Sequence, residues 1–173
     1  MNIFILHHDP KKCAQYHSDK HVVKMILELT QLLTCAQYFN YNDNPPYENC
    51  YKKTHINHPM SKWVREHPNN YSYTLLLALY LCKEFKYRRN KTHACYFHLS
   101  MLYNLDPIKG ENINWEDKIR HNILDCEYDL TPIPMCMPDE YVKTCAVSSY
   151  RAYYKSKADI NSWNWGRNKP EWY

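Results

Sequence analysis

The sequence predicts a mainly α-helical protein that folds as one compact domain over residues 1–173, with irregular connections and an aromatic C-terminal tail. Two observations lead to this prediction. The chain has only 2 glycines, and because glycine supplies the left-handed positions of tight hairpin turns, a hairpin-rich β fold is disfavoured. Apolar residues also recur every three or four positions along several segments, which is the period of an amphipathic helix.

The first helix is predicted over residues 11–38. Asp9 followed by Pro10 has the pattern of an N-cap with proline at the first helical position. The polar run 40–46 ends this helix, because Asn, Asp and two prolines favour a loop. The apolar residues at helical spacing are Val22, Met25, Leu29, Leu32, Leu33 and Ala36.

The middle of the chain predicts three further helical segments. Residues 54–59 read as a helix start that continues through 61–66, and Pro68 interrupts or kinks it. Residues 69–89 are predicted to be a long helix with a basic C-terminal end, as the helix dipole favours. A further helix is predicted over residues 93–103.

The last third of the chain is less regular. Residues 115–124 have the pattern of a short helix, and 131–138 are predicted to be extended because prolines bound them. A short helix opens at Pro138, and the last helix is predicted over 148–158. The tail 161–173 is aromatic and basic, and we expect it to pack back on the domain or onto a ligand, since exposed aromatic rings are costly in water.

Composition narrows the classes of function. The formal net charge is +4 and the pI is about 8.5, which is compatible with a polyanionic partner such as DNA. The eight cysteines include no CxxC pair, and we expect reduced thiols, no secretion signal and an intracellular, monomeric protein. The longest apolar run, 75–82, is too short to span a membrane. Scarce glycine excludes phosphate-cradling loops, hence P-loop and dinucleotide-binding enzymes.

A first cluster of titratable residues lies near the start of the first helix. His17 and His21 share a face at i, i+4, and so do Lys20 and Lys24, with Glu28 beyond them. Such a patch can bind phosphate and supply a general acid or base. The alternative is an ordinary solvated helix face.

A second cluster lies at the start of the next helix. His55 and His58 precede Lys62 and Arg65, and a helix N-terminus here offers free N–H groups to a phosphate. The alternative is a capped helix that buries Trp63.

The four histidines of the two clusters also allow a metal-dependent hydrolase, if the helices bring His17, His21, His55 and His58 together. The HExxH pattern is absent and lysines beside the site would repel a cation, so no metal and no cofactor is expected.

A third, basic and aromatic band includes Arg88 and Arg89 at the end of the long helix. Aromatic residues interleaved with Lys and Arg can stack on bases and neutralise phosphates. In the same band, Tyr150, Tyr153 and Tyr154 have the spacing of a core stripe, and two of the three are predicted to lie in the core.

The order of these features resembles the pyrimidine-dimer DNA glycosylases of phages and large DNA viruses, which are small all-helical base-excision enzymes. The stretch 14–19 (Ala-Gln-Tyr-His-Ser-Asp) is similar to the family's alanine-acid-tyrosine-arginine-glutamate helix. The run 57–60 (Asn-His-Pro-Met), followed by Trp63 and the long helix to Arg89, resembles the family's second region. The closing Pro-Glu-Trp-Tyr of 170–173 resembles its proline-x-tryptophan-tyrosine tail.

The resemblance implies a duplex DNA partner and a chemistry. In that family the α-amine of the first residue attacks the sugar C1′ and forms a Schiff base, and a carboxylate on the first helix assists strand cleavage. Here the amine would belong to Met1, or to Asn2 after removal of Met1. Asp19 is the positional candidate for the carboxylate and Glu28 the reserve.

The resemblance also implies that His17 and Lys20 contact phosphates. Two departures from the family pattern, the missing N-terminal threonine and Asp in place of Glu, leave a non-catalytic nucleic-acid or nucleotide-binding protein as the alternative.

Overall fold

The computed structural model describes residues 1–105, 130–161 and 163–173. Over these residues the predicted all-helical fold is confirmed, and no strand occurs. The short helix expected over 115–124 lies outside the described residues. The helices are α1 (Pro10–Tyr16), α2 (Asp19–Asn40), α3 (Pro59–Glu66), α4 (Pro68–Arg89), α5 (Tyr96–Asn104), the 3-10 helix η1 (Asp139–Tyr141) and α7 (Ala146–Asn161).

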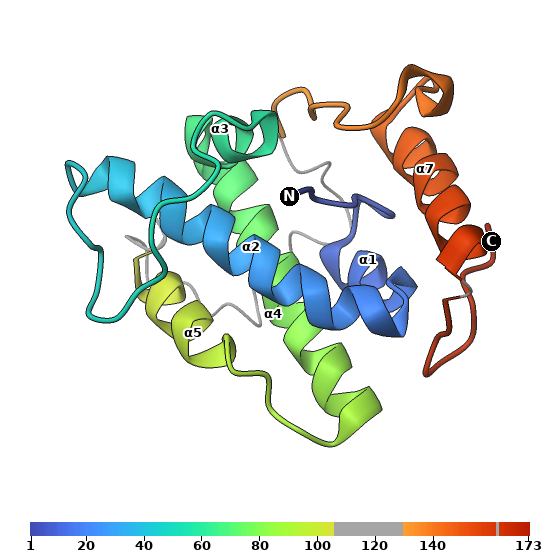
Figure 1. The fold of residues 1–173 in the computed structure, drawn as a ribbon, viewed down its shortest axis with the longest axis horizontal. Coiled ribbons are helices and arrows are strands. Elements are labelled where there is room, and N and C mark those ends of the chain that lie inside the picture. The colour runs from blue at the N-terminus through green and yellow to red at the C-terminus, as the bar shows by residue number, and fades with distance from the viewer. Residues whose placement is uncertain (106–129, 162) are drawn as a thin grey trace.

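The long helices α2 and α4 cross and form the centre of the core (Figure 1). The apolar segment 3–6 packs into this core, and its side chains are at most 5% exposed. This burial is favourable by about 25 cal/mol per Å² of apolar surface, and it fixes the position of the chain's first residues. The residues that fill the centre include Met25, Leu29, Leu33, Trp63, Tyr73, Leu77 and Leu81.

The helix predicted over 11–38 is in fact two helices, a correction to the sequence analysis. His17 and Ser18 adopt extended backbone angles between α1 and α2. The Ser18 side chain caps α2 by accepting from the His21 N–H, and the Ser18 N–H donates to the hydroxyl of Tyr154 at 2.8 Å. The Asp19 N–H donates to the carbonyl of Asn164. These partners from the C-terminal part of the chain satisfy the groups that the break leaves open.

The expected break at Pro68 is confirmed, whereas the helix expected to start over 54–59 begins only at Pro59. α3 begins with Pro59 and α4 with Pro68, because proline lacks the N–H that a first helical turn would leave unpaired. His58 and His67 cap these helices, and each accepts a backbone N–H at its ring Nδ1 atom. Residues next to each other in the sequence therefore determine where α3 and α4 begin.

The C-terminal tail packs back on the domain, as predicted. Arg167 donates two hydrogen bonds to the buried Glu84, at 2.8 and 2.9 Å, and Glu84 also pairs with Arg88. Arg88 pairs with Asp19 at 3.0 Å. The indole of Trp165 donates to the carbonyl of Tyr16. The tail is thus attached to α1, α2 and α4 by a network of ion pairs and hydrogen bonds.

The last helix extends one turn or less beyond its predicted ends, and its tyrosines divide as expected. Tyr150 and Tyr154 are fully buried, whereas Tyr153 is partly exposed. The cysteines of the described segments are free thiols, and Cys13, Cys35, Cys82 and Cys95 are buried. Within these segments no helix has the length and apolar character needed to cross a membrane.

Candidate active site at the amino terminus

The beginning of the chain contacts the carboxylate of Glu28. The main-chain nitrogen of Asn2 donates to Glu28 Oε2 at 3.0 Å, although 26 residues separate them. Burial of the segment 3–6 holds Asn2 in place from one side, and α2 holds Glu28 from the other. The structure therefore places the reserve carboxylate, Glu28, beside the amino terminus.

Glu28 lies at a partly open position. Its side chain is 16% exposed, and the Lys24 ammonium, 65% exposed and one turn earlier on α2, lies 3.4 Å from Glu28 Oε1. One carboxylate oxygen thus faces the start of the chain and the other faces a cation. This arrangement keeps the carboxylate within reach of solvent and of a substrate, because the site is not sealed.

His58 is a third titratable group at this place. Burial lowers the pKa of His58, and the N-terminal charge of Met1 and the neighbouring His55 lower it further. Glu28 opposes this shift. Its Nδ1 accepts the Met60 N–H at 3.2 Å. The neutral ring therefore carries its proton on Nε2, where it can donate to a bound oxygen atom.

The side chain of Asn2 is held by a segment far away in the chain. Its Nδ2 donates to the Cys136 carbonyl at 2.9 Å, and its Oδ1 accepts the Ile3 N–H. The Tyr150 hydroxyl orders this segment by donating to the Pro134 carbonyl and accepting from the Cys136 N–H. The sequence analysis did not identify Cys136, since no motif links it to the amino terminus.

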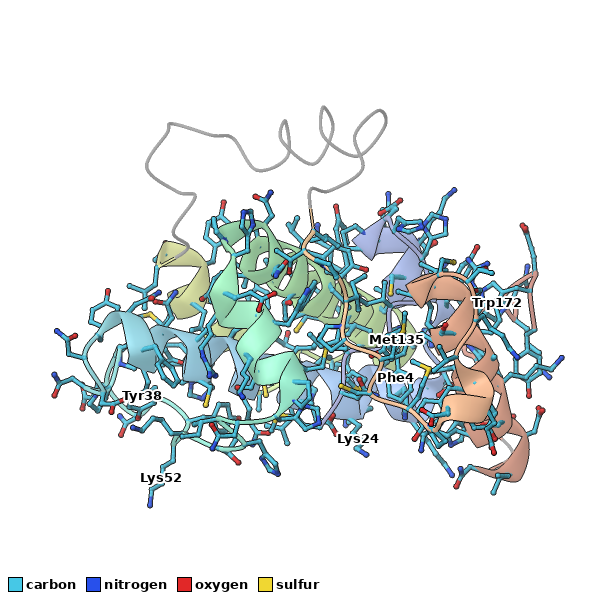
Figure 2. The ribbon with its side chains drawn as sticks, turned by 90° about the horizontal axis from the view of Figure 1, so that it is seen from above. Phe4, Lys24, Tyr38, Lys52, Met135 and Trp172 are labelled. Carbon is cyan, nitrogen blue, oxygen red and sulfur yellow. The ribbon has the colours of Figure 1, made fainter. Side chains whose placement is uncertain are left out.

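Basic side chains are exposed on the helices beside the Asn2–Glu28 contact, which we call the amine–carboxylate pair. Lys20 and Lys24 are exposed on α2, and Lys62 and His55 are exposed near the start of α3. Lys24 and Lys157 both lie close enough to His21 to lower its pKa. Since Lys157 belongs to α7, this helix reaches the same region as Lys24. In Figure 2, Lys24 and Lys52 project from the same face of the molecule. We call Lys20, Lys24, His55, His58, Lys62 and Lys157 the basic rim.

The expectation that His17 and His21 form an exposed phosphate-binding patch is wrong. His17 is fully buried and His21 is 5% exposed. Burial lowers the pKa of His17 to about 4 and that of His21 to about 2. The His17 Nδ1 donates to the Cys13 carbonyl, and the His21 ring packs against Trp163 at 4.1 Å between centroids. Both are neutral core residues that support the C-terminal tail.

The basic band at the end of α4 also needs correction. The Arg88 side chain is 2% exposed and is occupied by Asp19, Glu84 and two carbonyls, so it is not available to a phosphate. Arg89 is exposed. Arg65 donates to the Ile56 carbonyl and covers the ring of Phe39, and it stabilises the loop before α3.

Asp19 is engaged at a different place from the amino terminus. Its Oδ1 accepts from Arg88 at 3.0 Å and from the Gly166 N–H at 2.7 Å. Gly166 fits closely there, since a Cβ would lie 3.2 Å from both Asp19 Oδ1 and Arg88 Cγ. The structure therefore joins Asp19 to the tail and Glu28 to the amino terminus.

The metal-site alternative finds no support in the described segments. There, no three His, Cys, Asp or Glu side chains are grouped so that they could hold an ion. His17 and His21 lie in the aromatic core, whereas His58 lies near the amino terminus. The four histidines therefore do not form one site.

Fold and site together define a small helical protein in which the main-chain nitrogen of the second residue contacts a carboxylate, with exposed cationic side chains on the helices beside it. The chain belongs to the pyrimidine dimer DNA glycosylase family, whose family model matches residues 1–97. Neither the curated proteins nor the solved structures include a significant match. The matched part carries Asn2, Glu28 and His58, while Cys136 and Tyr150 lie beyond it. Membership supports a DNA-repair glycosylase that binds DNA.

Proposed function

We propose that the protein removes a damaged pyrimidine from duplex DNA and then cleaves the strand, with the α-amine of its first residue as nucleophile and Glu28 as the assisting carboxylate. The contact between the Asn2 nitrogen and Glu28 Oε2, at 3.0 Å, carries this proposal. With Met1 present the nucleophile is the Met1 amine, and if Met1 is removed it is the Asn2 nitrogen itself.

An α-amine suits this chemistry because its reference pKa, about 7.7–8.0, leaves part of it unprotonated near neutral pH. The amine lone pair attacks the sugar C1′, and the bond from C1′ to the base breaks, with the electron pair leaving on the base. The attached nitrogen then gives a proton to the departing base. Its lone pair opens the bond from C1′ to the ring oxygen O4′, and that oxygen takes up a proton from water. The product is a protonated imine.

In the second step Glu28 acts as a base. The imine makes the C2′ protons acidic, and a carboxylate takes one of them. The resulting electron pair forms a double bond between C2′ and C3′ and expels the 3′ phosphate. Water then hydrolyses the imine and frees the amine.

Glu28 takes this role in preference to Asp19, for a geometric reason. Asp19 Oδ1 already holds Arg88 and the Gly166 N–H, and using it as a base would release the tail. Glu28 has one oxygen on the first residues of the chain and is partly open to solvent. Its position also lets it hold the amine in an orientation for attack.

The basic rim supplies the DNA-binding surface. Lys20 and Lys24 are exposed on α2 and Lys62 on α3, and each can neutralise a phosphate. His58 presents a neutral Nε2–H beside the amine, which can donate to a phosphate or sugar oxygen without adding charge next to the nucleophile.

The direct test is incubation with a duplex that carries one thymine dimer, followed by separation of the strands. The proposal predicts a break at the dimer, which an undamaged duplex does not show. Salt-sensitive binding to both duplexes without any break or base release would contradict it, and would support a non-catalytic DNA-binding protein.

A further inference from the structure

A cavity lies between α4 and α5, away from the amino terminus. It has a volume of about 500 Å³, and residues of the second half of α4, of α5 and of the segment between them line it. It shares no residue with the basic rim or with the amine–carboxylate pair. In Figure 1, α5 and the C-terminal end of α4 lie on the other side of α2 from the amino terminus.

The inner part of the cavity is apolar and aromatic. Leu76, Leu79 and Tyr80 line it from α4, and Tyr103 lines it from α5. Leu76 is 5% exposed and Tyr80 7%, whereas Tyr96, at the mouth, is 50% exposed. Flat rings and aliphatic side chains of this kind hold a planar aromatic group by stacking and burial.

The mouth of the cavity carries positive charge. Lys83 and Lys86 line it, and the Lys83 ammonium lies 5.2 Å from the centre of the Tyr80 ring. None of its lining residues in the described segments is acidic. Glu84 of the same helix pairs instead with Arg88 and Arg167. The mouth is therefore complementary to an anion.

The start of α5 adds to this charge. Thr92 and Tyr96 both line the cavity, and the N-cap residue of α5, Cys95, makes no side-chain capping bond. Because Thr92 and Tyr96 flank the first turn of α5, the positive end of its helix dipole lies at the cavity wall. The hydroxyls of Thr92 and Ser100 supply neutral hydrogen-bonding groups along the wall.

We propose that this cavity binds a single nucleotide, with its base among Leu79, Tyr80 and Tyr96 and its phosphate between Lys83, Lys86 and the start of α5. The apolar interior requires a planar aromatic group, and the charged mouth requires an anion attached to it. A nucleotide combines both, and it fits the volume of a small-molecule site. The site is separate from the proposed catalytic pair.

The test is calorimetric titration of the full chain with thymidine monophosphate at low salt. The double variant K83Q/K86Q should weaken binding by about tenfold, since two exposed charge contacts are lost. The matched control K11Q/K12Q removes the same charge from exposed positions on α1 and should leave the affinity unchanged. L79W should fill the cavity and abolish binding, with the melting temperature confirming that the variant is folded.

Three results would overturn the proposal: no binding by the unaltered chain, equal affinity in K83Q/K86Q, or equal affinity for benzoate and thymidine monophosphate. Uncharged thymidine should bind less tightly than the monophosphate. If a strand of four thymidylates displaces thymidine monophosphate, the bound nucleotide belongs to a DNA strand. If it does not, the cavity binds a free nucleotide. Either result is consistent with a nucleotide site. None of these readouts requires strand cleavage, so failure here and failure of the proposed function are distinguishable.

Discussion

The main-chain nitrogen of Asn2 lies 3.0 Å from a carboxylate oxygen of Glu28. Two parts of the structure produce this contact: the buried segment 3–6, which fixes where the chain begins, and the long helix α2. The Asn2 side chain is in turn held by the Cys136 carbonyl. The first residues of this chain are thus part of an ordered site.

Replacing Glu28 by Gln should lower the rate of strand cleavage by about 100-fold or more, because an amide cannot accept the C2′ proton. The fold should persist, since the side chain is partly exposed and Gln has the same shape. Cleavage of a duplex with a preformed abasic site measures this step. The control E48Q changes an exposed carboxylate elsewhere, and equal rates in E28Q and E48Q would exclude Glu28 as the base.

Replacing Asp19 by Asn should affect stability more than chemistry. It removes the charge that pairs with the buried Arg88 and weakens attachment of the tail at Gly166. We expect a loss of about 2 kcal/mol in the free energy of unfolding, because Arg88 stays buried with one carboxylate partner fewer. Urea denaturation measures it, with the exposed Glu171→Gln as control. A stable D19N protein without lyase activity would reverse the roles given to Asp19 and Glu28.

The stability of the protein should fall as the pH is lowered below 6.5. Burial lowers the pKa of His17 to about 4 and of His21 to about 2, so the unfolded chain takes up protons that the folded chain does not. The free energy of unfolding is therefore highest above pH 6.5, the pKa of a histidine in the unfolded chain. As the pH falls from there toward the pKa of the folded state, each histidine lowers it by about 1.4 kcal/mol per pH unit.

The variant His21→Phe isolates one of these contributions. Phenylalanine fits among Phe4, Tyr154 and Trp163, and it takes up no proton in either state. Urea midpoints across this pH range should therefore decline less steeply for the variant. Parallel curves for the two proteins would show that His21 is protonated in the folded state.

DNA binding should depend on the basic rim. Lys24→Gln and Lys62→Gln should each weaken binding to any duplex and lower the slope of log affinity against log salt by about one, if each lysine contacts one phosphate. Lys11→Gln, at an exposed position on α1, should leave the slope unchanged. Fluorescence anisotropy at several salt concentrations measures this, and identical slopes in all four proteins would place the DNA elsewhere.

The parts of the fold that depend on neighbouring residues were predictable. Pro59 and Pro68, each preceded by a capping histidine, mark the starts of α3 and α4 in the sequence itself. The break before α2 was not predictable from the apolar spacing, because it is stabilised by Tyr154 and Asn164 at the other end of the chain.

The site was predictable only in part, for the same reason. The resemblance pointed to the amine and to a carboxylate on the first helix, but spacing alone favoured Asp19. Which carboxylate reaches Asn2 depends on how the segment 3–6 packs, and the sequence does not show this. His17 and His21 looked like an exposed pair because helical spacing gives a shared face without saying whether that face is covered. Tyr154 packs against both rings, and Trp163 packs against His21.

The measurement that tests the central proposal most directly is borohydride trapping on a duplex with an abasic site, using a chain that begins at Met1. We expect a covalent protein–DNA product whose linkage, located by mass spectrometry, is the α-nitrogen of Met1 or of Asn2. A variant with two residues added before Met1 should give no such product. A linkage to a lysine such as Lys24, or no product from a chain that still binds the duplex, would contradict the proposed role of the amino terminus.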